Sequence, residues 1–213
     1  MGQLMEYFGA ALAERRRRPR DDIMTLLTQA EIPGVAERLS DEELTRFFIL
    51  LATAGNETVT KLLATLFGLL AEHPDQRHLL LERPDRIPGA VEETLRFDPP
   101  SQYQGRVTTR EITVHGRRLP KGARVLVINA ASGRDERKYA DPERWDVTRR
   151  FDLHLNFGHG RHVCLGKSLA LLESRVATEE LLKRLPHFTV TGSERMHSSN
   201  VRGLCSLKIA AGG

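Results

Sequence analysis

The chain has 213 residues, enough for one large domain or two small ones, and its 40% hydrophobic content is ordinary for a folded globular protein. Its longest uninterrupted apolar stretch, residues 47–52, is much shorter than the roughly 20 residues that cross a bilayer, and the N-terminus lacks a signal-peptide pattern. We therefore expect a cytoplasmic protein that does not bind a membrane.

The net charge of +4 raises the possibility of nucleic-acid binding, and the basic run 15–18 with Arg20 strengthens it. However, Glu14, Asp21 and Asp22 flank this run, and no aromatic residue is interleaved with it. We predict no nucleic-acid partner, and a basic face for an acidic protein remains open.

Two short helices are expected first, at residues 4–13 and 22–30, before Pro33 and Gly34 break the pattern. The strongest helical signal follows at residues 40–73, between the capping-box sequence Ser40 to Glu43 and Pro74. Its apolar residues occupy several sides, so we expect an exposed apolar patch around Phe47, Phe48 and Leu51.

The middle of the chain changes from helical to strand-like patterns. Helices are predicted at residues 75–83 and 86–97, and a β region at 104–129 contains strands at 107–114 and 124–129. An irregular segment, 130–163, precedes a helix at 165–185 and a β tail with strands at 188–190 and 204–209. The pattern indicates a mainly α fold with small β-sheets.

Only two cysteines are present, too few for a disulfide framework, and one of them has unusual neighbours. Cys164 lies in the glycine-rich segment 157–166, at the expected start of a helix. A helix N-terminus favours the thiolate, which is a ligand for iron, and glycines let a flat ligand approach the backbone. A buried cysteine in a turn, or a zinc site with His159 and His162, would also account for these residues.

The order Phe-x-x-Gly-x-His-x-Cys-x-Gly in this segment resembles the haem-binding signature of cytochrome P450 monooxygenases. The resemblance implies that Cys164 is the metal ligand, holding the iron of haem b, and that His162 and Arg106 pair with its propionates. The other residues expected to shape the cofactor site are Phe157, Gly158, Gly160 and Gly166.

A second motif, Ala54-Gly55-Asn56-Glu57-Thr58, lies in the long helix. Taken alone, Thr58 could bond to a carbonyl one turn earlier and Glu57 could be solvated. The motif is similar to the oxygen-binding groove of the same family, which implies that Ala54 and Gly55 make room over the iron. Glu57 and Thr58 would then be catalytic, delivering protons to bound dioxygen.

Glu93 and Arg96 are three residues apart on one helix and can pair. An isolated pair of this kind is usually exposed. The spacing resembles the buried Glu-x-x-Arg element of the family, which implies a structural role and a second arginine, for which Arg144 is the match. Trp145 and Arg149 resemble another family motif, but their place in the chain is wrong for it, so no role is assigned to Arg149.

The resemblance covers residues 1–213 as a partial P450 domain, and it implies that the N-terminal half of the family fold is absent. The implied function is a haem-thiolate monooxygenase that hydroxylates a small organic substrate, with a ferredoxin or flavodoxin-like electron donor and an NAD(P)H reductase. A peroxide-driven peroxygenase and a non-catalytic haem-binding fragment are the alternatives.

Overall fold

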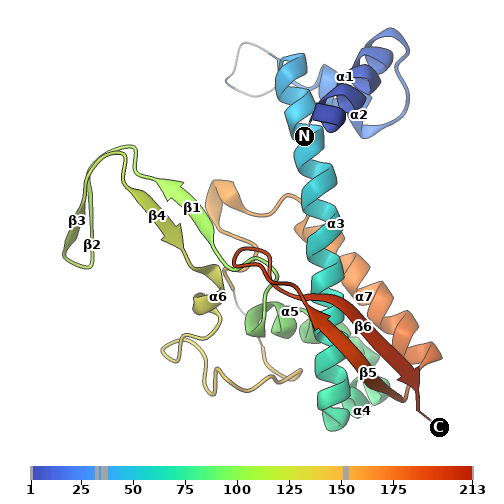
Figure 1. Cartoon of the computed structure of the whole chain (residues 1–213). Helices are drawn as coiled ribbons and strands as arrows, with labels where there is room; N and C mark the ends of the chain where they lie inside the picture. The colour runs from blue at the N-terminus through green and yellow to red at the C-terminus, as the bar shows by residue number, and fades with distance from the viewer. Residues whose placement is uncertain (1, 32–33, 35–37, 151–153, 213) are drawn as a thin grey trace. The chain divides into compact units, whose positions relative to one another are not determined.

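The computed structural model describes residues 2–31, 34, 38–150 and 154–212, and Figure 1 shows its elements. The chain forms two compact units, Met1–Glu57 and Thr58–Gly213. No helix in the described residues is both long and apolar enough to cross a membrane.

The first unit contains α1 (Gly2–Arg17), α2 (Ile23–Gln29) and the first part of α3 (Asp41–Glu72). The capping box forms as predicted, because the Ser40 amide donates to the Glu43 carboxylate at 2.8 Å and the Glu43 amide donates to Ser40 Oγ at 3.3 Å. These reciprocal bonds explain why the long helix begins here.

The expected exposed patch at Phe47, Phe48 and Leu51 is wrong. Phe48 is only 6% exposed and forms a small core with Leu12 and Leu44, against which Leu51 packs, while Phe47 is half-buried. Side chains of α1 and α2 cover this face, which the periodicity of the long helix alone could not reveal.

The second unit holds the remaining helices: the rest of α3, α4 (Pro74–Glu82), η1 (Pro84–Arg86), α5 (Ile87–Phe97), α6 (Asn129–Ser132), η2 (Gly160–His162) and α7 (Lys167–Arg184). Its core packs Leu66 and Leu70 of α3 against Val91 of α5, with Trp145 from the irregular segment and Phe188 after α7. All five side chains are at most 2% exposed, so α5 lies in the centre of this unit.

Three antiparallel strand pairs complete the second unit: β1 (Gln104–Val107) with β4 (Arg124–Val127), β2 (Ile112–Val114) with β3 (Arg117–Leu119), and β5 (Phe188–Arg195) with β6 (Leu204–Ala211). The first two pairs form one arm that extends away from the helices of this unit (Figure 1). The mainly α fold with small β-sheets is therefore confirmed.

The predicted strand at 107–114 is two strands, interrupted at residues 108–111. His115 and Gly116 both have positive φ, 47° and 77°, which makes the tight turn into the unpredicted strand β3. The strand predicted at 124–129 ends at Val127, because Asn129 begins α6.

Exposed apolar side chains gather at α7 instead of α3. Leu165 precedes this helix, and Leu169, Leu172 and Val176 follow at helical spacing on it, each between 44% and 73% exposed. This spacing puts them on one face of the helix.

Candidate functional site

The cysteine loop, residues 155–166, is closed by its own backbone. The Cys164 amide donates to the Phe157 carbonyl oxygen at 2.7 Å, and the Gly158 amide donates to the Leu155 carbonyl oxygen at 2.9 Å. The short helix η2 fills the turn between them. Cys164 is exposed at the end of this loop, so its thiol is accessible to a ligand.

The expectation that Cys164 lies at the first turn of the following helix needs correction. α7 begins at Lys167 with Gly166 as its N-cap, and the Lys167 amide donates to the Cys164 carbonyl oxygen at 3.2 Å. Because the helix dipole acts mainly within the first turn, the loop backbone has a larger part in placing the thiol than predicted.

Two of the loop glycines are required by the backbone. Gly158 and Gly160 have φ of 77° and 61°, a region that side chains disfavour. At Gly158 a Cβ atom would also lie 2.3 Å from the His162 carbonyl oxygen. Gly166 differs, since its φ is −84° and a Cβ would meet no atom within 4 Å.

A cavity of about 540 Å³ in the second unit brings several predicted site residues together. Cys164, His162 and Arg106 line it, with Thr58 from α3. The other predicted lining residues are Phe157 and Gly158, and apolar walls come from Val59, Leu62, Leu95, Val127 and Leu155. This is a volume typical of cofactor and small-molecule sites.

The lining fits an iron porphyrin in chemical terms. A thiol is available for the metal, Arg106 and His162 can pair with carboxylates, and aliphatic side chains can cover a flat apolar ring. Among the described residues, the guanidinium of Arg106 donates to the neighbouring Gly105 carbonyl oxygen alone, at 2.8 Å, and Arg106 is exposed, so it is accessible to an anion.

The cavity does not include every predicted residue. Gly160 and Gly166 lie in the loop but not in the lining. Ala54, Gly55 and Glu57 belong to the first unit, so their roles stay predictions. Among the described residues no three His, Cys, Asp or Glu side chains are arranged to hold a metal ion, which gives the zinc alternative no support.

Glu93 and Arg96 are fully buried, each with 0% of its side chain exposed, and Arg96 Nε donates to Glu93 Oε2 at 2.7 Å. The rest of the Arg96 guanidinium donates to carbonyl oxygens of Gly133, Pro142 and Arg144 at 2.6 to 2.9 Å. One buried ion pair thus holds the irregular segment against α5.

The prediction of Arg144 as the second arginine is wrong. Its side chain is 65% exposed, and only its backbone carbonyl joins the network. Arg149 takes the place, with Nε 3.3 Å from Glu93 Oε2 and 14% of its side chain exposed. The Asp146 amide also donates to Glu93 at 2.8 Å.

Asn156 fixes the position of the cysteine loop, a structural role that the sequence patterns did not reveal. Its Nδ2 donates to the Leu95 carbonyl oxygen at 2.6 Å, near the C-terminus of α5, where helix carbonyls have no partner within the helix. The bond therefore attaches the cysteine loop to α5, one residue from Arg96. The role depends on the end of α5 lying beside Asn156, and the sequence does not predict that the two lie side by side.

We expect Asn156→Ala to lower the free energy of unfolding by about 1–3 kcal/mol, since the partly buried Leu95 carbonyl would lose its donor. Urea unfolding measures the loss. Asn200→Ala, at an exposed asparagine, is the control and should change little. Equal effects of both changes would contradict the attachment.

His154, which immediately precedes the cysteine loop, should make the stability of the protein sensitive to acid. Burial, and secondarily the charge of Lys167, lowers the pKa of His154 from 6.5 to about 4. As pH falls below 6.5 the unfolded chain takes up a proton that the folded chain resists until about pH 4, so stability should fall across this window and then level. The difference between the urea midpoints at pH 7 and pH 5 should be smaller in His154→Gln than in the control His197→Gln, which changes an exposed histidine. An unchanged pH dependence in His154→Gln would refute this assignment.

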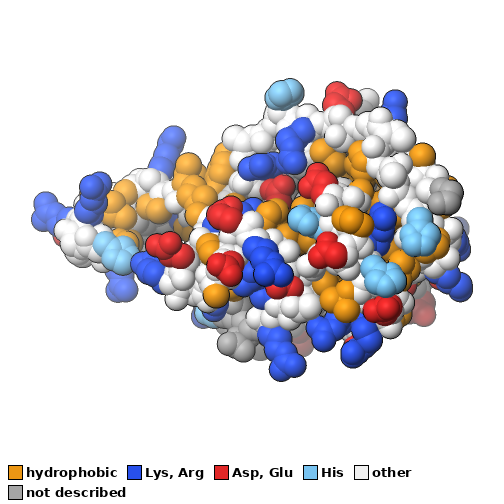
Figure 2. Space-filling model, turned by 90° about the horizontal axis from the view of Figure 1, so that it is seen from below, with side chains coloured by type: hydrophobic (Ala, Val, Ile, Leu, Met, Phe, Trp, Pro, Cys, Tyr) orange, Lys and Arg blue, Asp and Glu red, His pale blue; other side chains and the backbone are white. Residues whose placement is uncertain are grey.

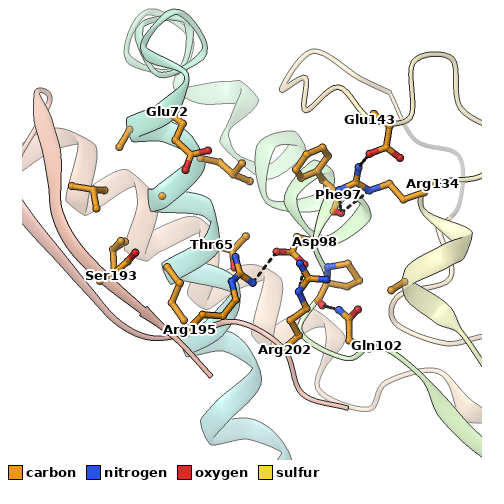
Figure 3. A pocket seen from close by; sticks show the side chains of 18 of the residues that line it. Thr65, Glu72, Phe97, Asp98, Gln102, Arg134, Glu143, Ser193, Arg195 and Arg202 are labelled. Carbon is orange, nitrogen blue, oxygen red and sulfur yellow. Dashed lines mark hydrogen bonds and ion pairs between the residues drawn. The ribbon is translucent and has the colours of Figure 1, made fainter. Parts of the chain in front are cut away.

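A second cavity, of about 920 Å³, lies between the C-terminal part of α3, the end of α5 and the β5–β6 pair. Several of its charged side chains are paired, as Figure 3 shows: Asp98 lies 3.6 Å from both Arg195 and Arg202, and Arg134 pairs with Glu143. None of the predicted site residues lines this cavity. We therefore do not assign it to the cofactor, although it is larger than the cavity at Cys164.

Comparisons with known proteins identify the relatives of this chain. The family model described as Cytochrome P450 matches residues 87–205. Putative cytochrome P450 123 of Mycobacterium tuberculosis is 40% identical over 211 residues, covering 98% of this chain and 52% of the relative. The biotin biosynthesis cytochrome P450 of Bacillus subtilis is 38% identical over 192 residues, covering 90% and 48%.

Solved structures match equally well. CYP109E1 from Bacillus megaterium, in complex with testosterone, has a TM-score of 0.91 and 34% identity, over 99% of this chain and 59% of that one. P450BioI, in complex with a fatty-acid-ligated acyl carrier protein, has a TM-score of 0.91 and 36% identity, over 97% and 53%. The chain spans about half the length of the curated relatives it matches. From the match to the family model and these relatives, we conclude that the chain belongs to the cytochrome P450 family.

Proposed function

We propose that this chain supplies the haem-binding part of a monooxygenase that hydroxylates a small organic substrate. The observation that carries the proposal is the single cavity lined by Cys164, His162, Arg106 and Thr58. A thiol, a helix hydroxyl, a guanidinium and an imidazole on one cavity fit what a haem-thiolate oxygenase requires.

Each lining residue has a proposed task. The Cys164 thiolate would hold the iron of haem b, while Arg106 and His162 would neutralise the propionates and orient the ring. When bound, the haem would supply the activation of dioxygen. Phe157 and the aliphatic walls would exclude water from the ring faces.

Thr58 and Glu57 are proposed to move protons. Hydroxylation consumes dioxygen, a pair of electrons and a pair of protons, and it releases water with the hydroxylated product. Thr58 lines the cavity, so its Oγ could pass a proton inward. Glu57, its neighbour on α3, would replenish that proton, and Ala54 and Gly55 would leave room for the oxygen ligand.

The electrons are proposed to come from a ferredoxin or flavodoxin-like donor served by an NAD(P)H reductase. Arg161, Lys167 and Arg175 lie in or just after the cysteine loop and could attract an acidic donor. The relatives bind ligands as unlike as testosterone and an acyl carrier protein carrying a fatty acid, so similarity selects no substrate.

The decisive test titrates the chain with haem and records the absorption of the reduced, carbon monoxide-bound form. A thiolate-type band, followed by product formation that depends on reductase and NAD(P)H, would support the monooxygenase. Turnover with peroxide alone would favour the peroxygenase, and a thiolate-type band without turnover would favour a haem-binding fragment.

Thr58→Ala should preserve haem binding but divert electrons to peroxide, because the proton path would be changed and the iron ligand would not. We expect product per NAD(P)H consumed to fall by about 10-fold or more, since a positioned acid–base group contributes roughly 10²- to 10⁴-fold to a rate. Thr58→Ser, which keeps the hydroxyl, should retain most coupling. An unchanged yield in Thr58→Ala would rule out the proton-transfer role.

A further inference from the structure

Lys167 joins the cysteine loop to α7 by two separate contacts. Its amide, at the start of the helix, donates to the Cys164 carbonyl oxygen at 3.2 Å. Its ammonium lies over the ring of Phe157, with Nζ 5.6 Å from the ring centroid, within the roughly 6 Å of a cation–π contact. Because the Cys164 amide donates to the Phe157 carbonyl oxygen at 2.7 Å, these three residues form a closed circuit of contacts.

The position of the Phe157 ring matters because Phe157 lines the cavity at Cys164. The ring of His154 lies 5.9 Å from it, with the two planes inclined by 40°. Phe157 is also partly buried against the main core of the second unit. The ring is therefore held by apolar and aromatic neighbours together with one ammonium group, and a movement of the ring would change the wall of the proposed cofactor site.

The charge of Lys167 acts on the groups around this ring. After burial, it is the second cause that lowers the pKa of His154, to about 4, so His154 is neutral at pH 7 and leaves Lys167 as the cation of this group of three. Lys167 and Phe157 are both only partly exposed, so water screens their contact less than it would at the open surface. A cation–π contact is stronger when the cation is partly desolvated.

We propose that Lys167 is a positioning residue of the cofactor site, which holds the Phe157 ring in the cavity wall through its positive charge. Where it concerns the haem, this inference rests on the proposed function, in which Phe157 excludes water from the ring faces. The task differs from attracting an electron donor, since it requires no donor to be present. With haem bound, a positive charge against the cavity wall should favour the reduced iron and raise its reduction potential.

The first test requires no haem. Hydrogen exchange of the Cys164 amide in the full chain, followed by NMR, reports how often its bond to the Phe157 carbonyl oxygen opens. Lys167→Met removes the charge and keeps the length of the side chain. We expect it to speed this exchange by about 3-fold, which corresponds to the loss of one cation–π contact. Lys167→Arg keeps the charge and should exchange like the wild type.

A double variant tests whether Lys167 acts through the aromatic ring. Phe157→Leu removes the ring, so adding Lys167→Met to it should speed the exchange no further. The matched control is Lys138→Met, at an exposed lysine whose Nζ lies 5.9 Å from the Tyr139 ring, a contact of the same kind outside the loop. Lys and Arg side chains are scattered over the surface seen in Figure 2, so this control measures any general effect of losing one charge. It should leave the exchange at Cys164 unchanged.

The reduction potential of the haem-bound chain, measured without a donor, is the second readout. Lys167→Met should lower the potential, whereas Lys167→Arg and Lys138→Met should leave it near that of the wild type. The proposal is overturned by unchanged exchange or potential in Lys167→Met, by an equal change in Lys167→Arg, or by a full effect that persists without the Phe157 ring. The expected exchange pattern in a chain that takes up no haem would support the positioning role and contradict the proposed function.

Discussion

Cys164→Ala should abolish the thiolate-type band of the reduced, carbon monoxide-bound chain. The cavity contains one cysteine among its described lining residues, so no other sulfur could replace it as the iron ligand. Haem affinity should fall by more than about 100-fold, because even changes behind a ligand commonly cost 10- to 100-fold in metal affinity. Haem titration followed by absorption measures both effects.

Cys205 provides the matched control. It is also an exposed thiol, but it lies on β6 and outside the cavity, so Cys205→Ala should behave as the wild type. Alkylation gives a second readout, since bound haem should protect Cys164 and leave Cys205 reactive. A thiolate-type band that survives in Cys164→Ala and disappears in Cys205→Ala would reverse the assignment.

Glu93→Ala and Arg96→Ala should each destabilise the second unit by about 3–5 kcal/mol, because each removes one member of a fully buried pair. Glu93→Ala leaves the buried Arg96 without its carboxylate, and Arg96→Ala leaves Glu93 with Arg149 as its remaining cation. Loss of Arg96 also removes its hydrogen bonds to the carbonyls of Gly133 and Pro142 and one of the two hydrogen bonds to the carbonyl of Arg144. Urea unfolding and haem retention should both report the damage.

Arg149 and Arg144 test whether the effect depends on the observed contacts of Glu93. Arg149→Ala should be clearly destabilising, since its guanidinium lies against Glu93, whereas Arg144→Ala should change stability by no more than about 0.5 kcal/mol. Wild-type melting of Glu93→Ala and Arg96→Ala would indicate a pair that contributes nothing. A larger effect at Arg144 than at Arg149 would contradict the observed network.

The sequence was most informative where one local rule determines the structure. Ser40 and Glu43 marked the start of α3, Pro74 marked its end, and the glycines around Cys164 marked a loop that only such residues can form. The strands β1 to β4 were harder to place. They have three or four residues each and are largely exposed, so they show little of the alternation that marks a half-buried strand.

Residues that act through backbone contacts could not be found in this way. Arg144 and Arg149 lie in the same irregular segment, and no periodicity shows which guanidinium turns inward. Asn156 contacts a carbonyl 61 residues away, which depends on how the cysteine loop meets α5. The proposed roles of Cys164, His162, Arg106 and Thr58 followed from motifs, and they remain predictions, as do those of Ala54, Gly55 and Glu57.

The partners of Arg96 also bear on how the second unit folds. Its bonds to the carbonyls of Gly133, Pro142 and Arg144 close loops of 37, 46 and 48 residues, and the segment they hold has almost no regular structure of its own. Closing such loops costs entropy before any bond forms, so the segment should order late, after α5 is already helical. During refolding, protection of the amides of α5 should therefore precede protection of the Asp146 amide. The slowest folding step would then be the burial of the Arg96 side chain, which requires both α5 and the irregular segment.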